Sequence, residues 1–148
     1  MKVLTQTNTG LLNIGILLLR CMTGLILFVA GAGKVMGWFG GFGMKTTLEM
    51  FKTGMNISAP WAYISSYAEF VGGLLLIIGF LARPAAFALV INMLVAVILT
   101  GTKNFFMGGA AYPCSLGISC LVILLSGPMA YSIDALLANR ERTQLLNN

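Results

Sequence analysis

Four long apolar stretches account for most of this chain, and they limit what it can fold into. They cover about residues 11–33, 61–82, 84–101 and 109–126. A helix rises 1.5 Å per residue, so about 20 apolar residues cross the ~30 Å hydrocarbon core of a bilayer. Lipid offers no partner for unpaired backbone N–H and C=O groups, so such segments fold as helices. The sequence therefore predicts an all-α membrane protein, a bundle of four transmembrane helices.

The composition leaves little material for a water-exposed domain. Of the 148 residues, 58% are hydrophobic and only 9% are charged, whereas a soluble domain carries roughly 25% charged residues. We therefore expect one transmembrane domain over residues 1–148. The first apolar stretch ends in small residues that resemble a signal-peptide cleavage site. It is too long for a signal peptide and contains Arg20, so we expect it to be a retained span.

The connections between the predicted spans differ in length. Arg83-Pro84 is expected to form a tight turn that makes the second and third spans antiparallel. The connection over residues 34–60 is long and rich in glycine. Within residues 44–52 the apolar side chains recur at helical spacing with charges between them, which predicts a short interfacial helix. Near the end of the chain, Ser132 is positioned to cap a last short helix.

Residue types that the chain lacks exclude several kinds of chemistry. There is no histidine, so bis-histidine haem, the usual zinc sites and histidine acid–base catalysis are not available. Cys21, Cys114 and Cys120 have no C-x-x-C spacing and lie in apolar stretches, where we expect them to be packing residues. We predict no metal site, and no residue stands out as catalytic.

The net charge of +5 indicates contact with lipid headgroups rather than with nucleic acid. Most of the lysines and arginines lie beside apolar stretches, where they attract anionic lipids. No basic cluster interleaved with aromatic residues is present, so we do not expect nucleic-acid binding. The basic residues divide evenly between the two sides of a four-span chain, so charge alone does not decide its orientation.

Four polar side chains lie inside or at the ends of the predicted spans and form a candidate intramembrane pocket. A charge at membrane depth costs about 2.5–3.5 kcal/mol and therefore marks either a structural pair or a functional site. Arg20 and Lys34 share one stripe of the first span, and Glu69 lies on the facing stripe of the second. We expect Arg20 to pair with Glu69 and Lys34 to compete for it. Asn92 is expected to form an interhelical hydrogen bond.

Two interpretations of the Glu69 site remain open. The first is a structural ion pair that locks two helices together. The second is a site at which Glu69 handles protons or binds a polar headgroup.

On the same two stripes, small residues allow the helices to approach closely, and we predict that four of them pack helices: Gly24, Gly31, Gly72 and Gly73.

The order and spacing of these residues resemble the DoxX family over about residues 12–137. The resemblance implies a four-helix protein of the bacterial inner membrane with ties to membrane redox and oxidative-stress systems. Members often carry a glutamate shortly before the aromatic-proline pair of the last span, whereas this chain has Gly109-Ala110-Ala111 there. The motifs that carry the resemblance are Arg20-x3-Gly24-x3-Phe28-x2-Gly31-x2-Lys34, Glu69-x2-Gly72-Gly73, Gly79, Arg83, Met93, Gly127-Pro128 and Tyr131-Ser132-x-Asp134.

Three functions follow as expectations. The leading one is an accessory membrane subunit that supports a redox or envelope partner and has no independent catalytic activity. The second is a quinone-linked oxidoreductase subunit, with Arg20, Glu69 and Lys34 around the quinone headgroup. The third is a small carrier or lipid-binding protein that uses the same polar pocket. No cofactor motif is evident, quinone remains open as a cofactor, and a homo-oligomer or a redox partner protein remains open as an assembly.

Overall fold

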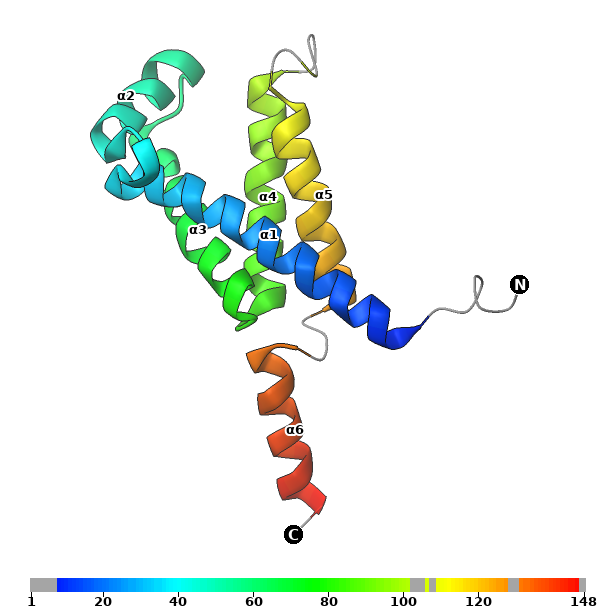
Figure 1. Cartoon of the computed structure of the whole chain (residues 1–148). Helices are drawn as coiled ribbons and strands as arrows, with labels where there is room; N and C mark the ends of the chain where they lie inside the picture. The colour runs from blue at the N-terminus through cyan, green and yellow to red at the C-terminus, as the bar shows by residue number, and fades with distance from the viewer. Residues whose placement is uncertain (1–7, 102–105, 107–108, 128–130, 147–148) are drawn as a thin grey trace.

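The computed structural model describes residues 8–101, 106, 109–127 and 131–146. Over these residues the chain forms six α-helices and one short 3-10 helix (Figure 1). Three helices are long and apolar enough to cross a membrane, and a fourth apolar helix is shorter. The prediction of an all-helical chain with several apolar spans is therefore confirmed. The elements are α1 (Thr9–Met36), η2 (Trp38–Gly40), α2 (Gly43–Met55), α3 (Ala59–Ile78), α4 (Ala82–Thr100), α5 (Ala111–Ser126) and α6 (Ile133–Leu146).

The first helix is longer than the apolar stretch that predicted it. The Asn8 side chain caps its start by accepting a hydrogen bond of 2.9 Å from the Gly10 N–H. Gly37 ends it in the left-handed conformation with φ 73°, which glycine adopts without steric cost. The helix therefore includes Lys34 in its last turn. This extension decides where that lysine lies relative to the neighbouring helices.

The core lies where α1, α3, α4 and α5 meet. Leu27, Leu76 and Leu89 are almost or completely buried there, one from each of the first three of these helices. From α5, Cys120 is completely buried in the same cluster, as its apolar surroundings predicted. The three cysteines are free thiols. Many large apolar side chains on the outer faces are exposed, as expected for helices whose solvent is lipid.

Small residues bring α1 and α3 into very close contact. A Cβ added at Gly31 would lie 2.3 Å from the Phe70 backbone nitrogen, and one added at Gly73 would lie 2.4 Å from that of Phe28. The rings of Phe28 and Phe70 stack beside this contact with centroids 5.2 Å apart. A Cβ at Gly24 would meet the Gly73 carbonyl oxygen at 2.8 Å. Close backbone approach of this kind stabilises helix pairs in lipid through packing.

Gly72 takes part in a different contact from the other three glycines predicted to pack helices. A Cβ added there would lie 3.1 Å from the Leu89 side chain, so this glycine faces α4 rather than α1. Figure 1 shows α1 running diagonally across the α4–α5 pair, with α3 beside it and α2 at its far end. The predicted glycines therefore serve two helix contacts.

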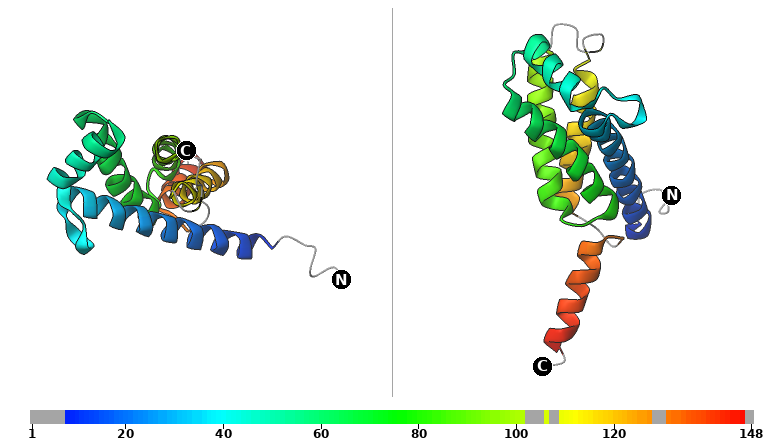
Figure 2. Two further views of the ribbon diagram at one scale, coloured as in Figure 1. Left: turned by 90° about the horizontal axis from the view of Figure 1, so that it is seen from above. Right: turned by 90° about the vertical axis from the view of Figure 1, so that its left-hand side faces the viewer.

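The start of α6 is docked onto the turn between α3 and α4. The Asp134 carboxylate accepts hydrogen bonds from the backbone N–H groups of Leu81 at 2.9 Å and Ala82 at 3.0 Å. The Asp134 N–H in turn donates to the Gly79 carbonyl oxygen at 3.1 Å. Ser132 caps α6 as predicted, because its Oγ accepts a bond of 3.1 Å from the Ala135 N–H. Beyond this attachment α6 extends away from the other helices (Figure 2).

We expect Asp134→Ala to destabilise the protein by about 1 kcal/mol, the usual cost of losing a helix cap. The Asp134 carboxylate caps the first amides of α4, where the positive end of the helix dipole also favours an anion. Hydrogen exchange of the Leu81 and Ala82 amides should become faster. Asp134→Asn, which retains one side-chain acceptor, should keep part of the protection. Unchanged exchange at both amides in the alanine variant would contradict the capping role.

Candidate functional site

Three polar side chains from three different helices meet between α1, α3 and α4. The Lys34 ammonium donates to both carboxylate oxygens of Glu69, at 2.7 Å to Oε1 and 2.6 Å to Oε2. The Asn92 Nδ2 also donates to Glu69 Oε1, at 3.2 Å. The Glu69 carboxylate is thus held by one cation and one neutral donor. We call Lys34, Glu69 and Asn92 the polar triad.

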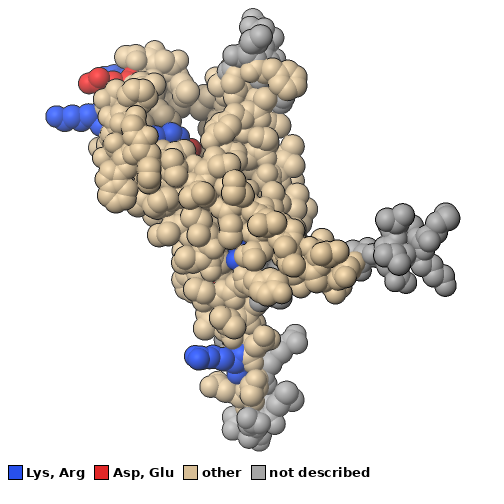
Figure 3. Space-filling view, in the orientation of Figure 1, with Lys and Arg blue, Asp and Glu red and all other residues tan. Residues whose placement is uncertain are grey.

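The polar triad is buried on one side and open on the other. The Glu69 side chain is only 6% exposed, whereas that of Lys34 is 31% exposed. In Figure 3, blue and red atoms meet at the bottom of a notch between the end of the molecule that carries α2 and the ends of α4 and α5. Tyr112, at the start of α5, is close enough to Glu69 for an electrostatic interaction. A small molecule with polar atoms can therefore approach the triad from the notch.

The close packing of α1 on α3 positions the ion pair. Gly31 lies against the backbone of Glu69 and Phe70. Lys34 is three residues further along the same face of α1, so it lies about one helical turn from that contact. Its long side chain spans this turn and reaches the carboxylate. The Thr47 hydroxyl, from α2, donates to the Lys34 carbonyl oxygen at 3.3 Å and links the interfacial segment to the end of α1.

The expected pair between Arg20 and Glu69 does not form, and this part of the sequence interpretation was wrong. A Cβ added at Gly79 would lie 2.9 Å from the Arg20 guanidinium, so Arg20 reaches the far end of α3. Glu69 and Gly79 are ten residues apart, roughly 15 Å along a helix. That pair would require Arg20 and Glu69 to lie at the same depth in the bundle. The glycine contacts set a different register, in which Lys34 is the residue near Glu69.

Arg20 belongs instead to the contact between α1, the α3–α4 turn and the start of α6. It is 2% exposed, and its Nη2 donates to the Tyr131 carbonyl oxygen at 2.6 Å. Ser132 meets Arg20 at Gly79, where an added Cβ would also come within 2.8 Å of the Ser132 side chain. Arg20 therefore connects α1 to the Tyr131–Asp134 segment. It is not part of the polar triad.

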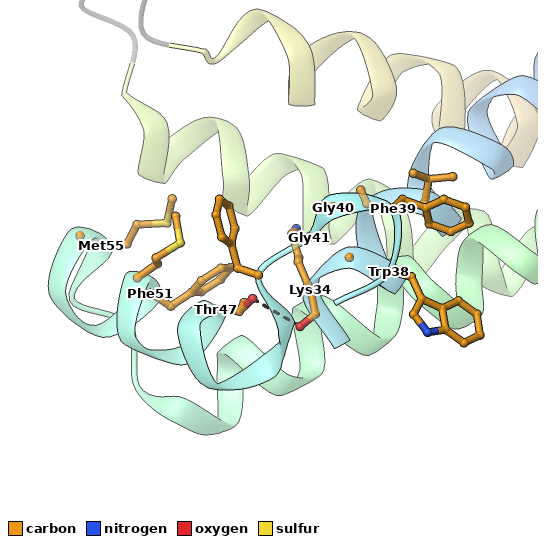
Figure 4. Close-up of a pocket in the computed structure, with 14 residues that line it drawn as sticks. Lys34, Trp38, Phe39, Gly40, Gly41, Thr47, Phe51 and Met55 are labelled. Atoms are coloured by element: carbon orange, nitrogen blue, oxygen red, sulfur yellow. Dashed lines mark hydrogen bonds between the residues drawn. The ribbon is translucent and has the colours of Figure 1, made fainter. Parts of the chain in front are cut away.

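A largely apolar pocket opens beside the triad, between the end of α1, η2 and α2 (Figure 4). Its volume is about 560 Å³. Lys34 lines it, and Figure 4 shows this side chain between Phe51 and Met55 on one side and Trp38 and Phe39 on the other. The residue spacing in this part of the sequence does not predict the pocket. The glycine-rich run Gly37–Gly43 was the one signal that could have indicated it, because glycines allow a tight return of the chain.

Two glycines of the loop, Gly40 and Gly41, line this pocket. A Cβ added at Gly41 would lie 2.3 Å from the Gly33 Cα, so the loop backbone packs directly on the end of α1. Gly37, Gly40 and Gly43 all have positive φ angles of 73–78°, which are unstrained for glycine. The loop can therefore turn back sharply and hold its aromatic residues beside α2. The triad and the pocket share Lys34 and together offer a polar end and an apolar body.

The polar groups of this site are suited to binding a ligand and to placing a charge. Among the described residues no group of three or more histidine, cysteine, aspartate or glutamate residues is arranged to hold a metal ion. The triad provides hydrogen-bond donors from Lys34 and Asn92 around one carboxylate. Such a cluster can hold a polar headgroup or move a proton at Glu69.

Comparison with known proteins gives consistent results. The family model described as DoxX matches residues 15–102. The chain is 30% identical over 122 residues to the "Putative oxidoreductase CatD" of Bacillus subtilis (strain 168), covering 82% of this chain and 86% of that protein. It is 28% identical over 128 residues to the "Inner membrane protein YqjF" of Escherichia coli (strain K12), covering 84% of this chain and 93% of that protein.

No solved structure matches the chain significantly. The homology to an inner membrane protein and the several apolar helices agree with the predicted location, a multi-pass protein of the bacterial inner membrane. The family match covers more than half of the chain and includes the polar triad, the glycines of the α1–α3 contact and Arg20. The chain is a membrane protein of the DoxX family.

Proposed function

We propose that this protein is an accessory membrane subunit that supports a redox system of the bacterial envelope and has no independent catalytic activity. The observation that carries the proposal is the polar triad, a carboxylate that is 6% exposed and is held by Lys34 and Asn92. A buried charge cluster in a membrane helix bundle is costly, and such clusters mark binding or proton-handling sites. The name of the Bacillus subtilis relative supports a link to redox chemistry.

A second function, a subunit that binds quinone, is favoured by the donors of the triad. A quinone ring carries two carbonyl oxygens and needs hydrogen-bond donors at its edge. Lys34 and Asn92 are both donors, and Lys34 also borders the aromatic pocket. In this second proposal the protein is the quinone-holding component of an oxidoreductase. Binding of a lipid or other solute is the third alternative.

Purification with native lipids tests the three alternatives directly. The full chain is extracted in lipid particles, and the bound proteins and small molecules are identified by mass spectrometry. A stable protein partner with redox activity is expected under the leading proposal, and bound quinone under the second. A solute or lipid without either would support the third and contradict both redox proposals.

A matched pair of variants connects the proposal to the triad. Glu69→Gln should fail to restore oxidant resistance in a deletion strain, because it removes the carboxylate that organises Lys34 and Asn92. Glu49→Gln makes the same chemical change at an exposed position of α2 and should restore resistance fully. Equal complementation by two variants expressed at the same level would contradict a functional role for the triad.

We further propose that the shorter apolar helix α5 is a fourth span and that α2 lies in the membrane interface. The 16 residues of α5 are packed on α4 and contribute Leu116, Cys120 and Ile123 to the core. At 1.5 Å per residue α5 is about 24 Å long, so the bilayer must thin slightly around it. α2 carries exposed Lys45, Glu49 and Lys52, as an interfacial helix does.

Four spans require both termini on one side of the membrane. Reporter fusions at residues 1 and 148 should give the same location, and fusions at residues 56 and 105 should both give the opposite one. We expect the termini to be cytoplasmic. Opposite locations for the two ends would contradict the four-span arrangement.

A further inference from the structure

The pocket between α1, η2 and α2 combines an apolar interior with one shared polar group. Its volume of about 560 Å³ is within the range of small-molecule sites, and its walls are mainly aromatic and sulfur-containing side chains. Lys34 lines it and is also the cation of the polar triad. The pocket is thus suited to a ligand with a bulky apolar body and one polar group beside Lys34.

The hydrogen bonds of Lys34 limit what that polar group can be. A lysine ammonium has three N–H donors. Within the described part of the chain two of them are directed to Glu69, at 2.6 and 2.7 Å. The third can bond to one further acceptor, and the 31% exposure of the Lys34 side chain leaves room for it.

Charge decides between a neutral and an anionic acceptor. The carboxylate of Glu69 lies directly behind the ammonium and neutralises it, so the pair carries no net charge. An anionic headgroup would meet that carboxylate in a medium of low dielectric constant, where like charges repel strongly. A neutral carbonyl oxygen accepts the same hydrogen bond without this cost.

We propose that the α1–η2–α2 pocket binds a neutral amphiphile, with its apolar body against Phe51 and Trp38 and a carbonyl oxygen on the third proton of Lys34. The proposal deepens the proposed function, because it rests on the same triad and names the class of molecule that reaches it. Two sources share this chemistry: the ring carbonyl of a quinone and the ester carbonyl of a neutral glycerolipid. The following experiment separates them.

The two tryptophans of the chain provide local reporters. Trp38 lines the pocket, whereas Trp61 lies on α3, is 65% exposed and does not line it. Trp61→Phe therefore leaves a single tryptophan at the pocket, and Trp38→Phe leaves one outside it. The probes are decylubiquinone and a dibrominated diacylglycerol, both of which quench tryptophan fluorescence, titrated into the purified full chain in neutral detergent.

We expect saturable quenching of Trp38 by at least one of the two probes and only linear, non-saturating quenching of Trp61. The probe that saturates identifies the source of the carbonyl.

Phe51→Ala should raise the half-saturating concentration about tenfold, the change that corresponds to about 1.4 kcal/mol of lost contact. Gly54 lines the pocket, and a Cβ added there meets nothing within 4 Å. Gly54→Leu should therefore fill part of the pocket and block binding without disturbing the fold. Phe87→Ala, an exposed aromatic of α4, is the matched control and should change nothing.

Two further probes test the role of the carbonyl and the charge. A dibrominated alkane without a carbonyl should bind more weakly than the carbonyl probes, and Lys34→Met should remove that difference. A dibrominated fatty acid in its carboxylate form should also bind more weakly. Tighter binding of the fatty acid, equal quenching of the two tryptophans, or half-saturation unaffected by Phe51→Ala and Gly54→Leu would each overturn the proposal.

This result is independent of the redox test. Complementation and co-purification can identify a redox partner in a chain whose pocket binds no carbonyl probe. Conversely, saturable quenching at Trp38 can occur in a protein that assembles with no redox partner. The failure of one proposal is therefore distinguishable from the failure of the other.

Discussion

Lys34→Met is expected to destabilise the helix bundle by about 3–5 kcal/mol, the usual effect of removing one partner of a buried ion pair. The substitution leaves the Glu69 carboxylate 6% exposed with Asn92 as its remaining hydrogen-bond donor. A carboxylate buried to this extent is poorly solvated, so its uncompensated charge is costly in the folded state. Unfolding in mixed micelles with increasing denaturing detergent measures the loss. Lys45→Met, at an exposed position of α2, is the control and should be neutral.

The reverse substitution should cost less, because the two partners differ in exposure. In Glu69→Gln the Lys34 ammonium loses its counter-charge, but its flexible side chain is 31% exposed and can move into the notch. We expect a loss of roughly 2 kcal/mol. If Glu69→Gln were as damaging as Lys34→Met, the open notch would not relieve the lysine as the structure implies.

The double variant Lys34→Met with Glu69→Leu completes the cycle. Replacing both charges with apolar groups removes the desolvation cost along with the attraction, so much of the stability should return. A loss close to the sum of the two single losses would indicate that the side chains act independently and would contradict a direct pair.

Gly31→Ala is expected to have the second large effect, about 3 kcal/mol of destabilisation, at the upper end for overpacking. The new Cβ would lie 2.3 Å from the Phe70 nitrogen and 2.9 Å from the Glu69 carbonyl carbon. These atoms belong to the α3 backbone and cannot rotate away, so the two helices must separate. Separation would also pull Lys34 away from Glu69, and the variant should show reduced function as well as reduced stability.

Gly15→Ala provides the matched control within the same helix. A Cβ added at Gly15 meets nothing within 4 Å, and alanine is favoured over glycine inside a helix by roughly 0.5–1 kcal/mol. The control should therefore be neutral or slightly stabilising in the same unfolding assay. Similar behaviour of the two alanine variants would mean that α1 and α3 are not held at backbone distance.

The class of the protein and the positions of its helices follow from the amino-acid sequence. Four apolar stretches predict membrane helices because lipid leaves no alternative for the backbone, and the positions of Gly24, Gly31 and Gly73 predict a close pair. Ser132 as the cap of the last helix was also predictable, since capping depends on residues that are neighbours in sequence. Helix capping depends on neighbouring residues, and helix formation in lipid depends on the solvent. Neither requires knowledge of how the helices are aligned.

The partner of Glu69 depends on tertiary contacts that the sequence does not reveal. Three polar residues on two helices allow more than one pairing, and the α1–α3 register decides whether Lys34 or Arg20, roughly 21 Å apart along α1, lies near Glu69. The register depends on where Gly31 and Gly73 contact the opposite backbone and on the extension of α1 to Met36. The pocket likewise depends on a loop that folds back on Gly33, which brings residues 29–55 together. The partner of Glu69 and the pocket are therefore both set by contacts between segments that are distant in sequence. Which side chains meet depends on how the whole helices are aligned.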